Sequence, residues 1–122
     1  MSAFDELSAI PPQQLLAGYL ARAVHGEQVT LSVVEIEPNA ELPEHQHANE
    51  QLGVAVVGSL HFRIGDEERQ VGPGEIWTIP GSTPHSARGG PEGAVVIEVF
   101  GPPRTDWNAL TALEPQRPRW PG

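Results

Sequence analysis

Two histidines separated by a single residue, His45 and His47, are the first side chains in this sequence that could do chemistry together. Residues two apart in an extended segment point to the same side, so both imidazoles can reach one metal ion. Gln51 has the same parity, but in a straight strand it would lie roughly 13 Å beyond His47, too far to share an ion. We therefore expect residues 48–50 to turn and to return Gln51 on the antiparallel neighbour opposite the histidines, with Glu50 pointing away.

A second segment repeats this plan. Residues 74–79 predict a strand, the run Pro-Gly-Ser-Thr-Pro over 80–84 predicts a turn, and His85 opens the returning strand. Two such hairpins could converge on one site and add a third imidazole to the pair. A histidine pair on its own is more often a solvated edge than a ligand set, and His25 and His61, outside both segments, receive no role.

The last predicted strand, residues 94–100, has two different faces. One face is purely aliphatic, whereas the other carries Glu98 beside Phe100. If the second face lines the interior, Glu98 is a partly desolvated acid near the histidines. The alternative is that Glu98 faces solvent or pairs with an arginine, and the sequence leaves both open.

Two prolines, Pro102 and Pro103, stiffen the chain after this strand and fix the direction of Arg104. A rigidly held guanidinium can grip a carboxylate through two hydrogen bonds. The more common fate of a single arginine on an acidic surface is a pair with a local acid, here Asp106. Both interpretations stay open.

The strands that would position these residues are short and regularly spaced. Residues 29–36, 51–57 and 60–64 are also strand-like, and turns that contain Gly or Pro separate them, which predicts an all-β sandwich or barrel. Residues 13–24 have apolar side chains at helical spacing but lead into this β-rich region, so helix and strand are equally open there. Residues 107–122 form a Pro-rich tail, expected to be extended and without a sheet partner, whose two indoles should cover a surface of this chain or of a symmetry mate.

The composition excludes several kinds of chemistry. The 122 residues include no cysteine, and all seven cations are arginine, so disulfides, thiolate nucleophiles and Schiff-base lysines are absent. A net charge of −9 repels nucleic acids and anionic membranes. The longest apolar run, residues 52–57, is too short to cross a bilayer, and the N-terminus is acidic where a secretory signal would be basic. We expect a soluble, cytoplasmic protein with no nucleic-acid or membrane partner.

The histidine segments resemble the two sequence motifs of the cupin superfamily. The first motif is a Gly, five residues, His-x-His, a short spacer, an acidic or amide residue, six residues and a Gly. It is matched by His45, His47, Gln51 and Gly58, although Asn39 stands where the first Gly belongs and a Gln replaces the commoner Glu.

The second motif is matched by Gly74, Pro80, Gly81 and His85, while Gly89 stands where an Asn usually follows. The resemblance covers about residues 28–106. It implies a cupin jelly-roll barrel, also called a double-stranded β-helix, over residues 28–106, with an N-terminal arm over 1–27 and a C-terminal tail over 107–122.

By the same resemblance, His45, His47, Gln51 and His85 are the ligands of one divalent transition metal. Three imidazoles and an amide are all neutral, so the cation keeps its full charge and favours an anionic oxygen. The ligand types suit Ni, Fe, Mn, Co or Zn.

The run Glu98-x-Phe100-x-Pro102-x-Arg104, together with His-x-His and Gln51, resembles a narrower group, the small cupins of pectin and alginate breakdown that linearise unsaturated monouronates. In that group the strand acid is Asp, so Glu98 departs by one methylene. The resemblance implies that Glu98 shuttles a proton, Arg104 holds the substrate carboxylate and Phe100 packs on the sugar ring.

Two other functions remain open, since a fold alone does not decide function. One is an iron-dependent oxygenase, and the other is a domain that binds a metal or small ligand without turnover. In each case we expect a small-molecule partner. A homodimer is expected by analogy, because edge strands and the tail need covering.

Overall fold

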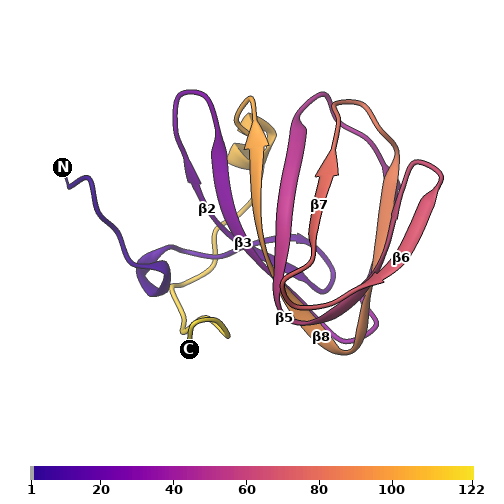
Figure 1. Cartoon of the computed structure of the whole chain (residues 1–122). Coiled ribbons are helices and arrows are strands. Elements are labelled where there is room, and N and C mark those ends of the chain that lie inside the picture. Colours follow the sequence, from indigo (N-terminus) through magenta and orange to yellow (C-terminus); the bar gives the residue numbers. More distant parts are fainter. Residues whose placement is uncertain (1) are drawn as a thin grey trace.

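The computed structural model describes residues 2–122 and shows strands arranged in two facing layers (Figure 1). The elements follow in the order η1 (Leu7–Ala9), β1 (Gln13–Leu16), β2 (Tyr19–His25), β3 (Thr30–Ile36), β4 (Glu41–His45), β5 (Glu50–Ile64), β6 (Glu67–Val71), β7 (Ile76–Ile79), β8 (His85–Gly101) and η2 (Thr105–Ala109), where η is a 3-10 helix. The strand pairs are antiparallel, and the expected all-β jelly-roll class is confirmed. Neither helix of the described chain is long and apolar enough to span a membrane.

The two longest strands, β5 and β8, belong to both layers. The first half of β5 and the last half of β8 complete the first layer, in the order β1-β2-β3-β8-β5-β7. Their other halves lie between β4 and β6 and form the second layer, β4-β8-β5-β6. The change of layer coincides with register shifts around Gly58, whose φ is 71° and whose added Cβ would lie 2.0 Å from the Gly93 carbonyl oxygen. This position therefore requires glycine.

Residues 13–24 are strand and not helix. A turn at Gly18, with φ 86°, joins β1 to β2, and β2 pairs with β3 from Tyr19↔Ile36 to His25↔Thr30. The helical spacing was a local signal, and the pairing with a long neighbouring strand overrides it. Two strands of the first layer thus come from the segment expected to be an N-terminal arm.

The sequence pattern indicated β4 only at its end, through the extended segment that contains His45, and it did not reveal β6. Their residues, ELPEH and EERQV, are mostly charged and exposed, because each strand lies at an edge of the second layer. Pro43 is compatible with such an edge, where one missing N–H costs no ladder hydrogen bond. An edge strand without apolar alternation leaves no periodic signal to detect.

The tail folds back onto the first layer. It places Trp107 against Phe100, with ring centroids 5.2 Å apart and the indole buried. Further along, the Arg119 guanidinium donates hydrogen bonds to the carbonyl oxygens of Ile36 and Ala94, at 2.9 and 3.1 Å. The expectation that the tail covers a surface of this chain is confirmed for the Trp107 indole.

The tail also closes over an ion pair. Arg22 lies 2.8 Å from Glu35 with its side chain fully buried, and it donates a second hydrogen bond to the Gln116 carbonyl oxygen. Among residues 107–122, the expected absence of a sheet partner holds except for an isolated bridge between Ala112 and Gln13.

Candidate metal centre

The two histidine-bearing motifs lie on connections that cross between the layers. One connection leads from β4 to β5 and the other from β7 to β8. The Ser82 N–H donates to the His47 carbonyl oxygen at 2.7 Å, and a Cβ added at Gly81 would lie 2.5 Å from the Ala48 carbonyl oxygen. The crossings therefore contact each other closely and hold their histidines together.

The expected hairpins are wrong in their pairing. β4 pairs with β8, where His45 lies directly opposite His85, whereas β5 pairs with β7 and β8. A crossing connection places its two strands in different layers, which residue parity cannot distinguish from a hairpin. Gln51 still returns to the histidines, with its Oε1 3.0 Å from His47 Nε2, and Glu50 is exposed as expected.

The three motif imidazoles form a cluster. One ligand nitrogen from each of His45, His47 and His85 lies within 4.8 Å of the other two. The ring centroids are 5.7 Å apart for His45 and His47, 4.2 Å for His45 and His85, and 5.0 Å for His47 and His85. His85 is buried and the other two are half-buried. Three nitrogen ligands this close together can bind one metal ion.

Each imidazole is fixed by a backbone carbonyl at its Nδ1. His45 contacts the Pro43 oxygen at 3.1 Å, His47 the Asn49 oxygen at 3.0 Å and His85 the Thr83 oxygen at 2.8 Å. A carbonyl oxygen only accepts, so in the neutral rings Nδ1 carries the proton and Nε2 carries the lone pair. Such contacts fix the tautomer and ring orientation of metal-binding histidines.

The Gln51 amide presents its oxygen to this cluster. Its Nε2 donates to the Glu98 carboxylate, which leaves Oε1 facing His47 Nε2 at 3.0 Å. With the His47 proton on Nδ1, two lone pairs face each other there, an arrangement that a cation or an added proton on Nε2 would stabilise. The donor set therefore fits a metal ion.

Two further observations agree with a metal site. His85 Nε2 is buried without a hydrogen-bond partner in the described chain. Burial lowers the pKa of His85 to about 4, and burial followed by the Arg104 charge lowers the pKa of His47. Both rings are therefore neutral at neutral pH, with Nε2 lone pairs available to a metal.

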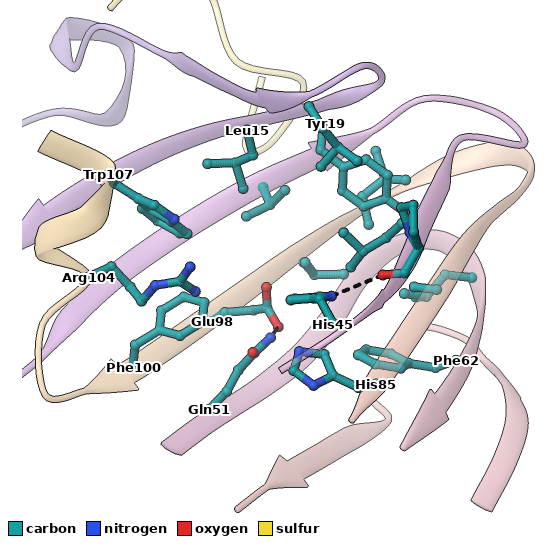
Figure 2. Close-up of a pocket in the computed structure, with 18 of the residues that line it drawn as sticks. Leu15, Tyr19, His45, Gln51, Phe62, His85, Glu98, Phe100, Arg104 and Trp107 are labelled. Atoms are coloured by element: carbon teal, nitrogen blue, oxygen red, sulfur yellow. Dashed lines mark hydrogen bonds between the residues drawn. The ribbon is translucent and has the colours of Figure 1, made fainter. Parts of the chain in front are cut away.

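Glu98 faces the interior, which resolves the alternatives left by the sequence. Its side chain lines the cavity beside Gln51 (Figure 2) and is 8% exposed. Desolvation raises its pKa, while hydrogen bonds from Gln51 and Trp77 oppose that shift. Both donors contact Oε2, with Trp77 Nε1 at 3.1 Å, so Oε1 remains for a further partner.

Trp77 was missed by sequence reasoning. It lies on β7 opposite Gly53 of β5, and its indole packs against Phe62 with ring centroids 5.1 Å apart. The signal that could have located it is its parity, since Trp77 and Ile79 are the buried pair of a short strand. Residue parity predicts that the Trp77 side chain is buried, but it does not identify the carboxylate that the indole contacts.

Arg104 has the local acid partner that one of the two interpretations expected, and it also lies at the cavity. Its Nε and Nη2 donate to the two carboxylate oxygens of Asp106 at 3.1 and 3.0 Å, so the local acid does pair with it. That contact holds the Asp106 pKa below its usual range. The guanidinium carbon also lies 4.8 Å from the Phe100 ring centroid and 4.7 Å from that of Trp107, at the wall of the cavity.

A cavity of about 460 Å³ joins these residues. His45, His85, Gln51 and Glu98 gather at one end (Figure 2). The remaining wall is mostly apolar and includes Leu15, Leu16, Val34, Ile36, Leu42, Leu60, Phe62, Val96, Trp107 and Leu110. The Tyr19 hydroxyl in this wall already donates to the Ala40 carbonyl oxygen at 3.1 Å.

Comparison with known proteins places the chain in a family. Residues 32–100 match the cupin domain family, so the chain belongs to that family. No curated protein matches the sequence. The resemblance of the sequence to the cupin superfamily is confirmed.

Solved structures agree. KdgF from Halomonas sp. shares 25% identity at a TM-score of 0.79, over 87% of this chain and 98% of that one. An RmlC-like cupin from Shewanella frigidimarina, with 19% identity, 88% and 96% coverage and a TM-score of 0.80, shares the fold. Oxalate decarboxylase from Bacillus subtilis shares 26% identity with this chain at a TM-score of 0.74. The match covers 89% of this chain and 31% of the oxalate decarboxylase chain. The oxalate decarboxylase of that species has Mn(II) centres.

Proposed function

We propose that this protein is a metal-dependent enzyme that opens the ring of an unsaturated uronate to its linear keto form. The proposal depends on one observation, that the buried carboxyl of Glu98 shares a cavity with a metal-binding cluster and keeps one oxygen free. The 25% identity to KdgF supports the assignment, as does the resemblance of the Glu98–Arg104 run to cupins that linearise unsaturated monouronates.

His45, His47, Gln51 and His85 would hold the metal, which is one of Ni, Fe, Mn, Co or Zn. A divalent cation there supplies a Lewis acid that polarises substrate oxygens. Because all four side chains are neutral, they leave its charge for an anionic substrate.

Glu98 moves the proton. In the ring opening, the hydroxyl on the hemiacetal carbon loses its proton as the bond from that carbon to the ring oxygen breaks, and the resulting enolate gains a proton on carbon. No oxidant is needed, because one proton leaves oxygen and one reaches carbon. Oε1 of Glu98 accepts the first and donates the second, and desolvation that raises its pKa suits a group that must do both near neutral pH.

Arg104 and Phe100 bind the substrate. Asp106 uses the Nε and Nη2 edge of the guanidinium, so Nη1 is the edge offered to the uronate carboxylate. The Phe100 ring, packed against Trp107, provides a flat apolar surface for the sugar ring. Asp106 and the two aromatic rings thus hold Arg104 in place for binding.

The test follows the absorbance of the conjugated double bond of an unsaturated uronate. The metal-loaded wild type should consume it, and Glu98→Gln should lose roughly 10²- to 10⁴-fold in rate. Glu92→Gln, an exposed carboxyl on the same strand, is the matched control and should retain the wild-type rate. Full turnover by Glu98→Gln would contradict the proposed role of Glu98 in proton transfer. If the metal-loaded wild type converted none of the uronate, the proposed reaction itself would be wrong.

The apolar cavity wall favours a second candidate. A sugar acid carries hydroxyl groups that need hydrogen-bond partners, whereas much of this wall is Leu, Ile, Val and aromatic carbon. We therefore also propose an iron-dependent oxygenase whose substrate has an oxygen-bearing head for the metal end and an apolar body for the far end.

Oxygen uptake separates the two candidates. Fe(II)-loaded protein with an amphiphilic diketone should consume O₂ if the second candidate is correct, and should leave O₂ unchanged with a uronate if the first is correct. Metal retention without turnover of either substrate would favour a domain that binds its ligand and does no chemistry.

A further inference from the structure

A chain of three polar side chains leads from β7 to the metal-binding cluster. The Trp77 indole N–H donates to Glu98 at 3.1 Å, and the same Glu98 oxygen accepts from the Gln51 amide. Trp77, Glu98 and Gln51 are 6%, 8% and 6% exposed. Both contacts are therefore shielded from water. Hydrogen bonds to a carboxylate are strong in such a buried environment.

The orientation of the Gln51 amide decides whether it can bind a metal. Only the oxygen of a primary amide has lone pairs to offer, since its nitrogen is a donor. Turning the Gln51 amide over would place Oε1 against the Glu98 carboxylate and the NH₂ group against the histidines. Glu98 excludes that arrangement by repulsion, so it holds Oε1 toward His47.

Glu98 is held in turn by Trp77, and the backbone is shaped for this contact. Gly53 lies opposite Trp77 in the register of β5 and β7. A Cβ added at Gly53 would lie 2.4 Å from the indole Nε1, so the indole lies directly on the backbone of that residue. Only glycine leaves the indole N–H where it reaches the carboxylate.

We propose that Trp77 is a positioning residue of the metal centre, which fixes Glu98 and through it the oxygen of Gln51, and that Gly53 provides the space this requires. The inference rests on the proposed metal site but not on the identity of the substrate. The hydrogen bond from the Trp77 side chain goes to Glu98 and not to a candidate metal ligand, so its effect reaches the metal through two hydrogen bonds.

The test compares Trp77→Phe with Trp107→Phe. Both changes replace a buried indole at the wall of the same cavity, but only Trp77 donates to Glu98. In metal-free protein, the ¹H–¹⁵N spectrum should show a Trp77 indole signal that shifts in Glu98→Gln, and Gln51 amide signals that shift in Trp77→Phe. Trp107→Phe should leave the Gln51 signals in place.

The second readout is metal affinity, measured by competition between Co²⁺ and a chelator, with the Co²⁺ absorption bands as a report of ligand geometry. Trp77→Phe should weaken affinity roughly tenfold or more and change the bands. Gly53→Ala, which keeps the indole but displaces it, should act in the same direction. Circular dichroism shows whether each variant is folded.

Three results would overturn the inference. They are unchanged Gln51 signals in folded Trp77→Phe, a Co²⁺ affinity of Trp77→Phe within twofold of wild type, and an effect of Trp107→Phe on the Gln51 signals or the Co²⁺ affinity equal to that of Trp77→Phe. A wild type that binds no metal would overturn it as well. A wild type that binds metal but converts neither candidate substrate overturns the proposed function and leaves the positioning role standing.

Discussion

The inner and outer faces of β8 differ sharply although their residues alternate along one strand. Glu98 and Phe100 point into the cavity, where they contact Gln51 and Trp107, while Ile97 and Val99 point outward and are half-exposed. Glu98 and Phe100 are enclosed between the two layers, whereas the side chains of Ile97 and Val99 remain partly open to solvent. A substitution should therefore affect the site on one face and the surface on the other.

The largest effect is expected from the three-histidine cluster on the inner side. Replacing His47 and His85 together with Ala leaves too few ligands, so the variant should retain no measurable metal. Elemental analysis of purified wild type and variant, before and after added metal, measures this. His61→Ala removes a surface imidazole that pairs with Glu68 and should leave metal content unchanged. Equal metal in wild type and the double variant would contradict the site.

The two faces should also differ in stability. Phe100 is 2% exposed and packs against Trp107, so Phe100→Ala should lower the free energy of unfolding by about 3–5 kcal/mol. Val99→Ala removes a half-exposed side chain and should cost less than about 1 kcal/mol. Chemical denaturation of both variants measures the difference. If the two costs were similar, the outer face would be as enclosed as the inner one.

Arg104 at the cavity wall is expected to affect substrate binding more than an exposed arginine does. Arg104→Lys keeps a charge but loses the planar contacts with Phe100 and Trp107 and the paired hydrogen bonds to Asp106. We expect KM for a uronate to rise roughly 10- to 100-fold with a smaller change in kcat. Arg88→Lys, at an exposed arginine of the same strand, serves as the control in steady-state kinetics. An unchanged KM in Arg104→Lys would contradict the proposal that Arg104 binds the substrate.

The smallest effect is expected at the position that departs from the uronate-linearising cupins. Glu98→Asp restores the acid of that group but shortens the side chain by one methylene, so its carboxylate can no longer reach both Gln51 and Trp77. We expect kcat to fall about tenfold and Co²⁺ affinity to fall with it. A Glu98→Asp variant faster than wild type would show that the shorter acid is the better proton carrier here.

Spacing along the sequence predicted which ligand candidates lie together. The His-x-His pair, Gln51 and His85 meet because strand parity and turn residues are local properties that survive folding. The inward direction of Glu98 was one of two alternatives, since parity groups residues on a face without saying which face is buried.

The partners of these residues came only from the structure. The sequence suggested that the His45 strand pairs with the Gln51 strand, but β4 pairs with β8. The contact between Trp77 and Glu98 joins two residues that are 21 positions apart in the sequence, and no local pattern connects them. The paired acid at Asp106 was foreseen because it lies two residues from Arg104.

Local patterns along the chain are sufficient to predict the all-β class, the family and the positions of the histidines, because periodicity, turn residues and motif spacing act over a few residues. The tertiary structure decided that residues 13–24 are strand, which layer each strand joins, how the Gln51 amide is turned and which face of β8 is enclosed. Those outcomes depend on contacts between residues far apart in the chain, where packing and desolvation outweigh local preference.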